Sequence, residues 1–141
     1  LKSSTEFTIT SPGDARDGMT VTAYQYRDNS LYVQASRGYN TENVVKPDFA
    51  APGVGILTAS IGAGRTFEQA TGTSLAAAQT AGIAALLLEW ALIRGNEPYF
   101  TGNSVKNYLS CGAVRDDIIQ YPNPNWGYGR VDLYHTFELL T

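Results

Sequence analysis

The segment from Ser74 to Arg94 constrains the fold more than any other part of this chain, because it predicts a long helix without a polar face. It is rich in Ala and Leu and contains no Pro, and its apolar residues cover nearly the whole helical circumference. A helix of that kind is buried, so we expect a sheet and other helices to surround it. The Gly95–Pro98 segment predicts its end.

Short strands are predicted before this helix and further helices after it. Alternation of apolar and polar residues predicts strands at 7–10, 19–26, 31–35, 56–59 and 65–70, with a hairpin turn at 28–30. Pro and Gly at Lys46–Gly53 predict rigid turns. Downstream, 121–129 is expected to be a loop, and helices are expected at 101–109 and 131–140. Apolar positions indicate Val131, Tyr134 and Leu139 as the inward side chains of the last helix.

Composition excludes several classes of function. The chain has 141 residues and is 43% hydrophobic, which is enough for one domain with a real core. Its net charge of −3 offers no basic excess for phosphates, so we expect no nucleic-acid partner. The apolar run Leu75–Leu88 falls short of the roughly 20 residues of a membrane span, so we expect no membrane partner either.

Metal binding is not expected from the side chains present. His135 and Cys111 are the only residues of their types, which argues against a site built from imidazoles or thiolates. The acidic residues at Asp14, Asp17 and 116–117 leave calcium open as an alternative. Because no full set of oxygen ligands is suitably spaced, we favour solvated loop carboxylates and expect no cofactor.

The residues that carry chemistry are Gly72-Thr73-Ser74, which place a serine in the first turn of the predicted helix. Unpaired N–H groups and the positive end of the helix dipole favour negative charge there, as on the oxyanion that a serine nucleophile generates. The Ser74 N–H is itself a candidate donor to that oxygen, and Gly72 lets the backbone pass close to a substrate. The alternative is that Thr73 or Ser74 merely caps the helix, a common role for these residue types.

Three segments in order resemble the subtilisin-like serine peptidases, the subtilases. Gly72–Gly82 is similar to their nucleophile motif Gly-Thr-Ser-x-Ala-x-Pro-x-x-Ala-Gly. Lys46–Val54 is similar to their Lys-Pro-Asp-x-x-Ala-Pro-Gly segment, and Trp126–Asp132 to their closing Gly-x-Gly-x-Val-(Asp/Asn) segment. Ala78 and Gln79 stand where the motif has its Pro and often a His, and neither departure removes a catalytic group.

The resemblance implies an α/β fold, the C-terminal part of a subtilisin-like domain with a mostly parallel sheet and flanking helices. Residues 1–141 would then form a single partial domain. It also implies that Ser74 is the catalytic nucleophile, which forms an acyl-enzyme with a polypeptide substrate. Thr71, Gly72 and Thr73 would approach the substrate backbone, and Leu75 would border the leaving-group side.

The rest of the family's catalytic machinery is missing from this chain. The triad runs Asp, His, Ser along a subtilase chain, yet no His precedes Ser74, and no segment of the type that holds the oxyanion Asn is present. We interpret His135 as a core-edge or surface residue and Asp48 as a structural one that caps its turn. We therefore expect the N-terminal half of the same parent domain to supply Asp, His and Asn. The isolated chain should be inactive, and it should expose a large apolar patch or form a homo-oligomer.

Within the subtilases, Leu86–Trp90, Arg94–Asn96 and Tyr121–Asn123 are similar to the clostridial germination-type peptidases. Those proteins process a precursor of a spore-cortex hydrolase, which implies an extracellular or cell-envelope location, the spore included. Some members lack an intact triad. A pseudoprotease or protein-binding domain on the subtilase scaffold is therefore the alternative function.

Overall fold

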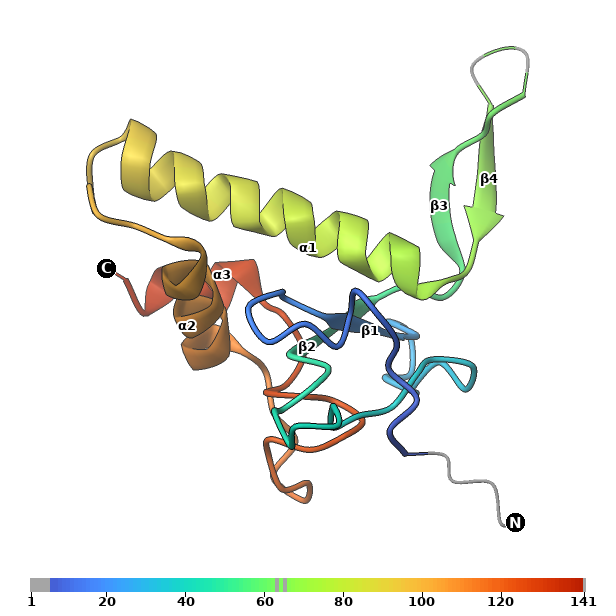
Figure 1. The fold of residues 1–141 in the computed structure, drawn as a ribbon. Coiled ribbons are helices and arrows are strands. Elements are labelled where there is room, and N and C mark those ends of the chain that lie inside the picture. Colours follow the sequence, from blue (N-terminus) through green and yellow to red (C-terminus); the bar gives the residue numbers. More distant parts are fainter. Residues whose placement is uncertain (1–5, 63, 65, 141) are drawn as a thin grey trace.

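The computed structural model describes residues 6–62, 64 and 66–140. Helix α1 lies across the molecule, with β1 and β2 beneath its first half and α2 and α3 beneath its second (Figure 1). The elements in chain order are β1 (Val21–Tyr24), β2 (Phe49–Pro52), β3 (Ile56–Ala59), β4 (Phe67–Ala70), α1 (Thr73–Leu88), the π-helical turn η1 (Glu89–Ile93), α2 (Gly102–Gly112) and α3 (Leu133–Glu138).

The parallel sheet of this chain, within its described residues, is the pair formed by β1 and β2, with Val21 opposite Phe49. The prediction of rigid turns at Lys46–Gly53 is wrong where β2 forms. Pro52 is the last residue of that strand. β3 and β4 confirm the strands predicted at 56–59 and 65–70, of which Arg65 lies outside the described residues. They pair as an antiparallel hairpin that projects from the body (Figure 1).

Two other strand predictions fail for lack of a partner. The run at 7–10 forms no strand, although Thr8 N donates to Arg37 O at 2.9 Å. The run at 31–35 contributes only an isolated bridge between Leu31 and Tyr24. The turn that joins it to β1 does form, because Gln25 N donates across it to Ser30 O at 2.8 Å.

The inner face of α1 packs on the β1–β2 sheet and on the downstream helices. Ala76, Thr80 and Leu87 are buried on this face, and Thr80 Oγ1 satisfies its hydrogen bond by donating to Ala76 O at 2.9 Å. One core cluster joins the inner face of α1 to β2 and α2: Phe49, Leu87, Ala91, Phe100, Val105 and Leu109.

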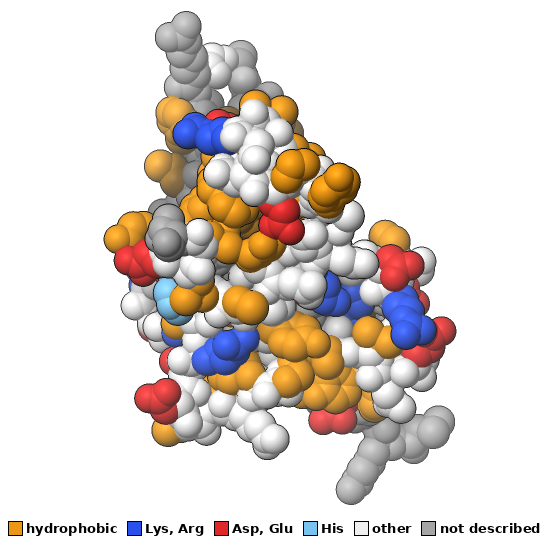
Figure 2. Space-filling view, turned by 90° about the vertical axis from the view of Figure 1, so that its left-hand side faces the viewer, with side chains coloured by type: hydrophobic (Ala, Val, Ile, Leu, Met, Phe, Trp, Pro, Cys, Tyr) orange, Lys and Arg blue, Asp and Glu red, His pale blue; other side chains and the backbone are white. Residues whose placement is uncertain are grey.

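The prediction that α1 is buried on all sides is wrong for this chain. The side opposite the sheet carries exposed apolar residues, and Leu86 is 49% exposed. Figure 2, viewed from the side on which α1 ends, shows hydrophobic side chains gathered on the surface. We call the side of α1 opposite the sheet the outer face of α1. Its exposed apolar members are Ala77, Ala78, Ala81, Ala85, Leu86 and Leu88. Such a patch is what the sequence predicts for a partial domain.

The length argument against a membrane span is also wrong, because α1 and η1 together form one helix longer than the apolar run. Among the described residues, Thr73–Ile93 has 21 residues, and an 18-residue window of it has a mean hydropathy of 1.5 and is 22% buried, which is long and apolar enough by length and composition to cross a membrane. The contacts of its inner face with β1 and β2 are those of a core helix, and core helices pass the same test.

Helix α3 is shorter than predicted and faces differently. It spans Leu133–Glu138, and Asp132 caps it by accepting from His135 N at 2.9 Å. Tyr134 and Leu139 are 74% and 56% exposed, so their predicted inward orientation is wrong.

Candidate active site

Ser74 is the second residue of α1, and its side chain is exposed. The N-cap is Gly72, and no side chain forms a capping hydrogen bond, so the interpretation of Thr73 or Ser74 as a cap is wrong. Among the described residues, the Ser74 hydroxyl has no hydrogen-bond partner. The N–H groups of this first turn have no carbonyl one turn earlier in the helix, so the hydroxyl lies in a field that favours negative charge.

Close backbone packing at Gly53 fixes where α1 begins. Gly53 follows β2, its N–H donates to Tyr24 O at 3.0 Å, and its carbonyl accepts from Gly72 N at 2.8 Å. A Cβ at this position would lie 2.6 Å from Ala23 Cβ, so only glycine fits. The serine-bearing turn therefore lies at the carboxyl ends of the two parallel strands, where open α/β sheets place their sites.

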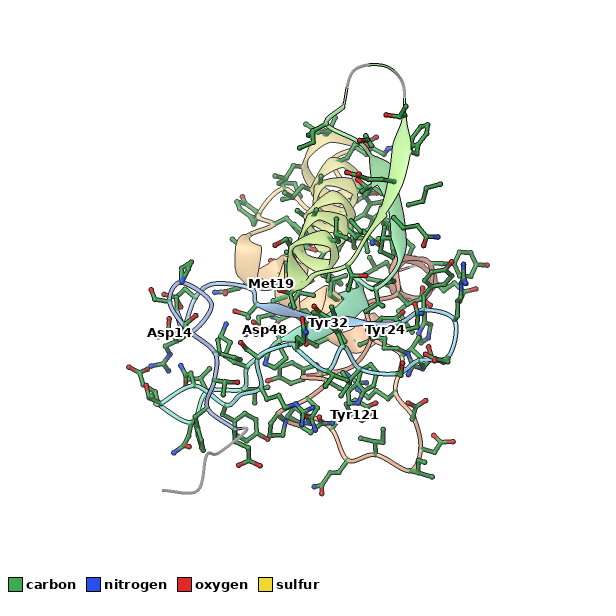
Figure 3. The ribbon with its side chains drawn as sticks, turned by 90° about the vertical axis from the view of Figure 1, so that its right-hand side faces the viewer. Asp14, Met19, Tyr24, Tyr32, Asp48 and Tyr121 are labelled. Carbon is green, nitrogen blue, oxygen red and sulfur yellow. The ribbon has the colours of Figure 1, made fainter. Side chains whose placement is uncertain are left out.

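A groove of about 580 Å³ runs beside the start of α1, and we call it the Ser74 groove. Its walls come from the first turn of α1 and from the segment that leads into β1. Figure 3 looks at the start of α1 and shows Met19 and Asp48 just below it. The lining residues are Pro12, Gly13, Gly18, Met19, Thr20, Val21, Thr73, Ser74 and Ala77.

The predicted substrate-binding residues do not all share this groove. Thr73 lines it together with Ser74, but Leu75 lines a separate pocket of about 890 Å³ between β3 and α1. Thr71 lines neither, and its Oγ1 accepts from Gly55 N at 2.9 Å. Beside Gly72 the space is open, because a Cβ there would have only Ser74 N within reach, at 3.9 Å.

His135 lies near the opposite end of α1 from Ser74, too far away to act as its base. It belongs to α3, under the end of α1 opposite Ser74 (Figure 1). Its Nδ1 is 3.2 Å from Gly112 O, which agrees with the interpretation of a half-buried residue at the core edge. No carboxylate, imidazole or amine is among the lining residues of the Ser74 groove within the described part of the chain, so the groove offers no proton acceptor.

Asp48 is structural, as the sequence predicts, but the expectation that it caps its own turn is wrong. Its Oδ2 accepts from Thr20 N at 2.7 Å and pairs with Lys46 Nζ at 2.8 Å, and both charged side chains are fully buried. Sequence reasoning missed this ion pair. Its signal is the spacing of two residues in an extended segment, which puts both side chains on one face.

No residue of the described ranges belongs to a group of three or more His, Cys, Asp or Glu side chains suited to a metal ion.

Near the end of β1, burial raises the pKa of the Tyr24 phenol, and the charge of Arg130 opposes that shift.

Comparison with solved structures finds the same fold in proteases. The chain is similar to the Clostridium perfringens CspB protease, with a TM-score of 0.91 and 41% identity over 99% of this chain and 30% of that one. It is also similar to the prenylagaramide maturation protease PagA, with a TM-score of 0.76 and 25% identity over 96% of this chain and 47% of that one. The first similarity bears out the resemblance to a clostridial subtilase.

Sequence comparison identifies a bacterial relative and a family. An uncharacterised protein of Aquifex aeolicus (strain VF5) is 28% identical over 137 residues, which cover 83% of this chain and 59% of that protein. The chain thus spans only part of each relative. The model of the subtilase family matches residues 2–129. With Ser74 in the predicted position at the start of α1, and this match over most of its length, the chain belongs to the subtilase family.

Proposed function

We propose that the full-length protein containing this chain is a serine endopeptidase with Ser74 as its nucleophile. One observation carries the proposal: the Ser74 hydroxyl is exposed and without a partner among the described residues, at the positive end of a 16-residue helix, and it lines an open groove. Family membership and the similarity to proteases support it.

The proposed reaction passes through an acyl-enzyme. Ser74 Oγ attacks the carbonyl carbon of an extended polypeptide, and a histidine takes the hydroxyl proton. The carbonyl oxygen becomes an oxyanion, to which the Ser74 N–H donates. The histidine then protonates the leaving amine as the C–N bond breaks, and water hydrolyses the ester by the same steps. The histidine, its orienting aspartate and an oxyanion asparagine come from the parent's N-terminal half.

The first turn of α1 and the residues before it meet the substrate. Thr71, Gly72 and Thr73 lie beside its backbone, and Leu75 borders the leaving-group side. Open space at Gly72 and the large pocket beside Leu75 support this assignment. Because a serine hydroxyl without a base is a weak nucleophile, the isolated chain is inactive.

A serine-directed fluorophosphonate tests the proposal on the full-length protein. We expect one adduct on Ser74, none in the Ser74→Ala variant, and none on the isolated chain. Absence of the adduct from a folded full-length protein that contains the upstream Asp, His and Asn contradicts the proposal. Peptidase activity of the isolated chain comparable to that of an intact subtilase contradicts the part about the missing base.

A pseudoprotease or protein-binding domain is the second candidate, and the lack of a proton acceptor among the described lining residues of the Ser74 groove favours it. Such a protein would recognise a protein partner and leave Ser74 unlabelled. Sequencing the parent upstream of Leu1 separates the two candidates, because only a peptidase requires the triad Asp and His. With the similarity to the CspB protease as support, we propose an extracellular or cell-envelope location, the spore included.

A further inference from the structure

A buried cluster of charges lies behind one wall of the Ser74 groove. Lys46 and Asp48 have no exposed side-chain surface and pair at 2.8 Å, and Lys106 of α2 pairs with the other carboxylate oxygen of Asp48. Burying charges is unfavourable unless they are paired and hydrogen-bonded, and an apolar replacement of a buried pair is often as stable. Stability alone therefore does not explain these side chains.

Their remaining hydrogen bonds go to the segment that lines the groove. Lys46 Nζ donates to Gly18 O, and Asp48 Oδ2 accepts from Thr20 N at 2.7 Å. The Asp48 N–H donates to Thr20 O at 2.7 Å as well. Thr20 Oγ1 in turn donates a hydrogen bond to Gly13 O at 2.5 Å. Gly13, Gly18 and Thr20 are all lining residues, and we call the segment 13–20 the groove rim.

We infer that Lys46 and Asp48 are positioning residues, which hold the groove rim at the distance from Ser74 that a bound peptide requires. The inference rests on the proposed function. The rim has few other contacts among the described residues. Residues 15–18 are exposed, Asn40 Nδ2 donates to Asp14 O at 3.0 Å, Ala15 N donates to Pro12 O at 3.1 Å, and Met19 packs against the core. Neither charged group touches the reacting atoms, so both act through the rim.

The cluster contains its own control. Lys106 shares the Asp48 carboxylate but makes no hydrogen bond to the rim, and its side chain is 27% exposed. Lys46→Met removes the ammonium that bonds to Gly18, whereas Lys106→Met removes an ammonium from the same carboxylate and leaves the rim bonds in place. A role limited to overall stability predicts that exchange at 13–21 changes no more than exchange in the rest of the protein, whereas a positioning role predicts a selective change at 13–21 in Lys46→Met.

The experiment uses the full-length protein and has two readouts at a temperature where circular dichroism shows each variant folded. Hydrogen exchange of the peptide covering 13–21 should accelerate tenfold or more in Lys46→Met and less than twofold in Lys106→Met. With a peptidyl phosphonate, the half-saturating concentration should rise tenfold or more in Lys46→Met, whereas the limiting rate of Ser74 modification stays within twofold.

Equal exchange in Lys46→Met and wild type overturns the inference, as does an equal response of Lys106→Met. If Lys46→Met does not fold, the isosteric Asp48→Asn variant replaces it, because the amide keeps the size of the side chain and removes the charge that accepts from Thr20 N and pairs with Lys46. Unchanged exchange at 13–21 in Asp48→Asn then overturns the inference. Wild-type protein that is never labelled refutes the proposed function instead, and the exchange comparison still decides the role of Lys46.

Discussion

Replacing Gly53 by alanine tests whether close backbone packing holds the serine-bearing turn. The added Cβ would lie 2.6 Å from Ala23 Cβ and 2.8 Å from Gly72 O. Ordinary contacts between such atoms are about 3.5–4.0 Å. Neither neighbour is the end of a flexible side chain, so the backbone must move. Overpacking of this kind costs about 1–3 kcal/mol. At about 2–4 °C per kcal/mol, the melting temperature should fall by roughly 2–12 °C.

The same shift should move Ser74, because Gly72 N donates to Gly53 O just before the helix begins. Since a displacement of about 1 Å can cost about 100-fold in rate, we expect phosphonate labelling of full-length Gly53→Ala to slow at least about tenfold. Gly102→Ala is the matched control, because a Cβ there meets nothing within 4 Å. Wild-type melting temperature and labelling rate in Gly53→Ala would refute the packing argument, as would equal losses in Gly102→Ala.

Three further results are expected. Gly72→Ala should leave the unfolding free energy within about 0.5 kcal/mol yet slow labelling more than tenfold, because its Cβ enters only the space proposed for substrate; unchanged labelling contradicts that role. Light scattering should show the isolated chain as an oligomer and its Leu88→Glu/Leu92→Glu variant as a monomer, since an oligomer would bury these exposed leucines; persistence of the oligomer contradicts this. The hydrogen bond from the Tyr108 hydroxyl to Glu97 raises the pKa of Tyr108 above 10.0. This bond should therefore stabilise the fold below pH 10, and the stabilisation should be lost as the pH rises through the raised pKa. An unchanged phenolate titration of Tyr108 in Glu97→Gln contradicts Glu97 as the cause of the shift.

The parts of the fold that the sequence predicts well are those in which local pattern and tertiary role agree. β1 alternates along its length, and α1 is a long Pro-free run of good helix formers, so both are found at nearly the right bounds. β2 is missed because Pro47, Pro52 and Gly53 are turn residues by type. Only pairing with β1 makes Phe49–Pro52 a strand.

In the candidate site, the sequence predicts Ser74 but not the residues that support the groove beside it. Ser74 is predicted as the nucleophile because three segments in order resemble the subtilases, since a serine at a helix start is by itself more often a cap. The structure removes that capping role. The link from Lys46 to the groove rim is invisible in sequence, because Gly18 and Lys46 are 28 residues apart and meet through a backbone carbonyl. Because every residue has a backbone carbonyl, the type of residue at position 18 does not indicate this bond.

Helix α1 is apolar on all sides although only its inner face is buried in this chain, which indicates that another part of the protein covers its outer face. The inner face is covered by β1, β2 and α2, whereas the outer face is exposed within the described chain. Covering that face would stabilise the fold by about 25 cal/mol for each Å² of apolar surface removed from water. Ser74 lies on the same side of the helix as Ala81 and Ala85, because steps of seven and eleven residues return to nearly the same angle. Whatever covers the outer face therefore arrives beside Ser74. Under the proposed function, the contact that completes the hydrophobic core is also the one that delivers the missing proton acceptor.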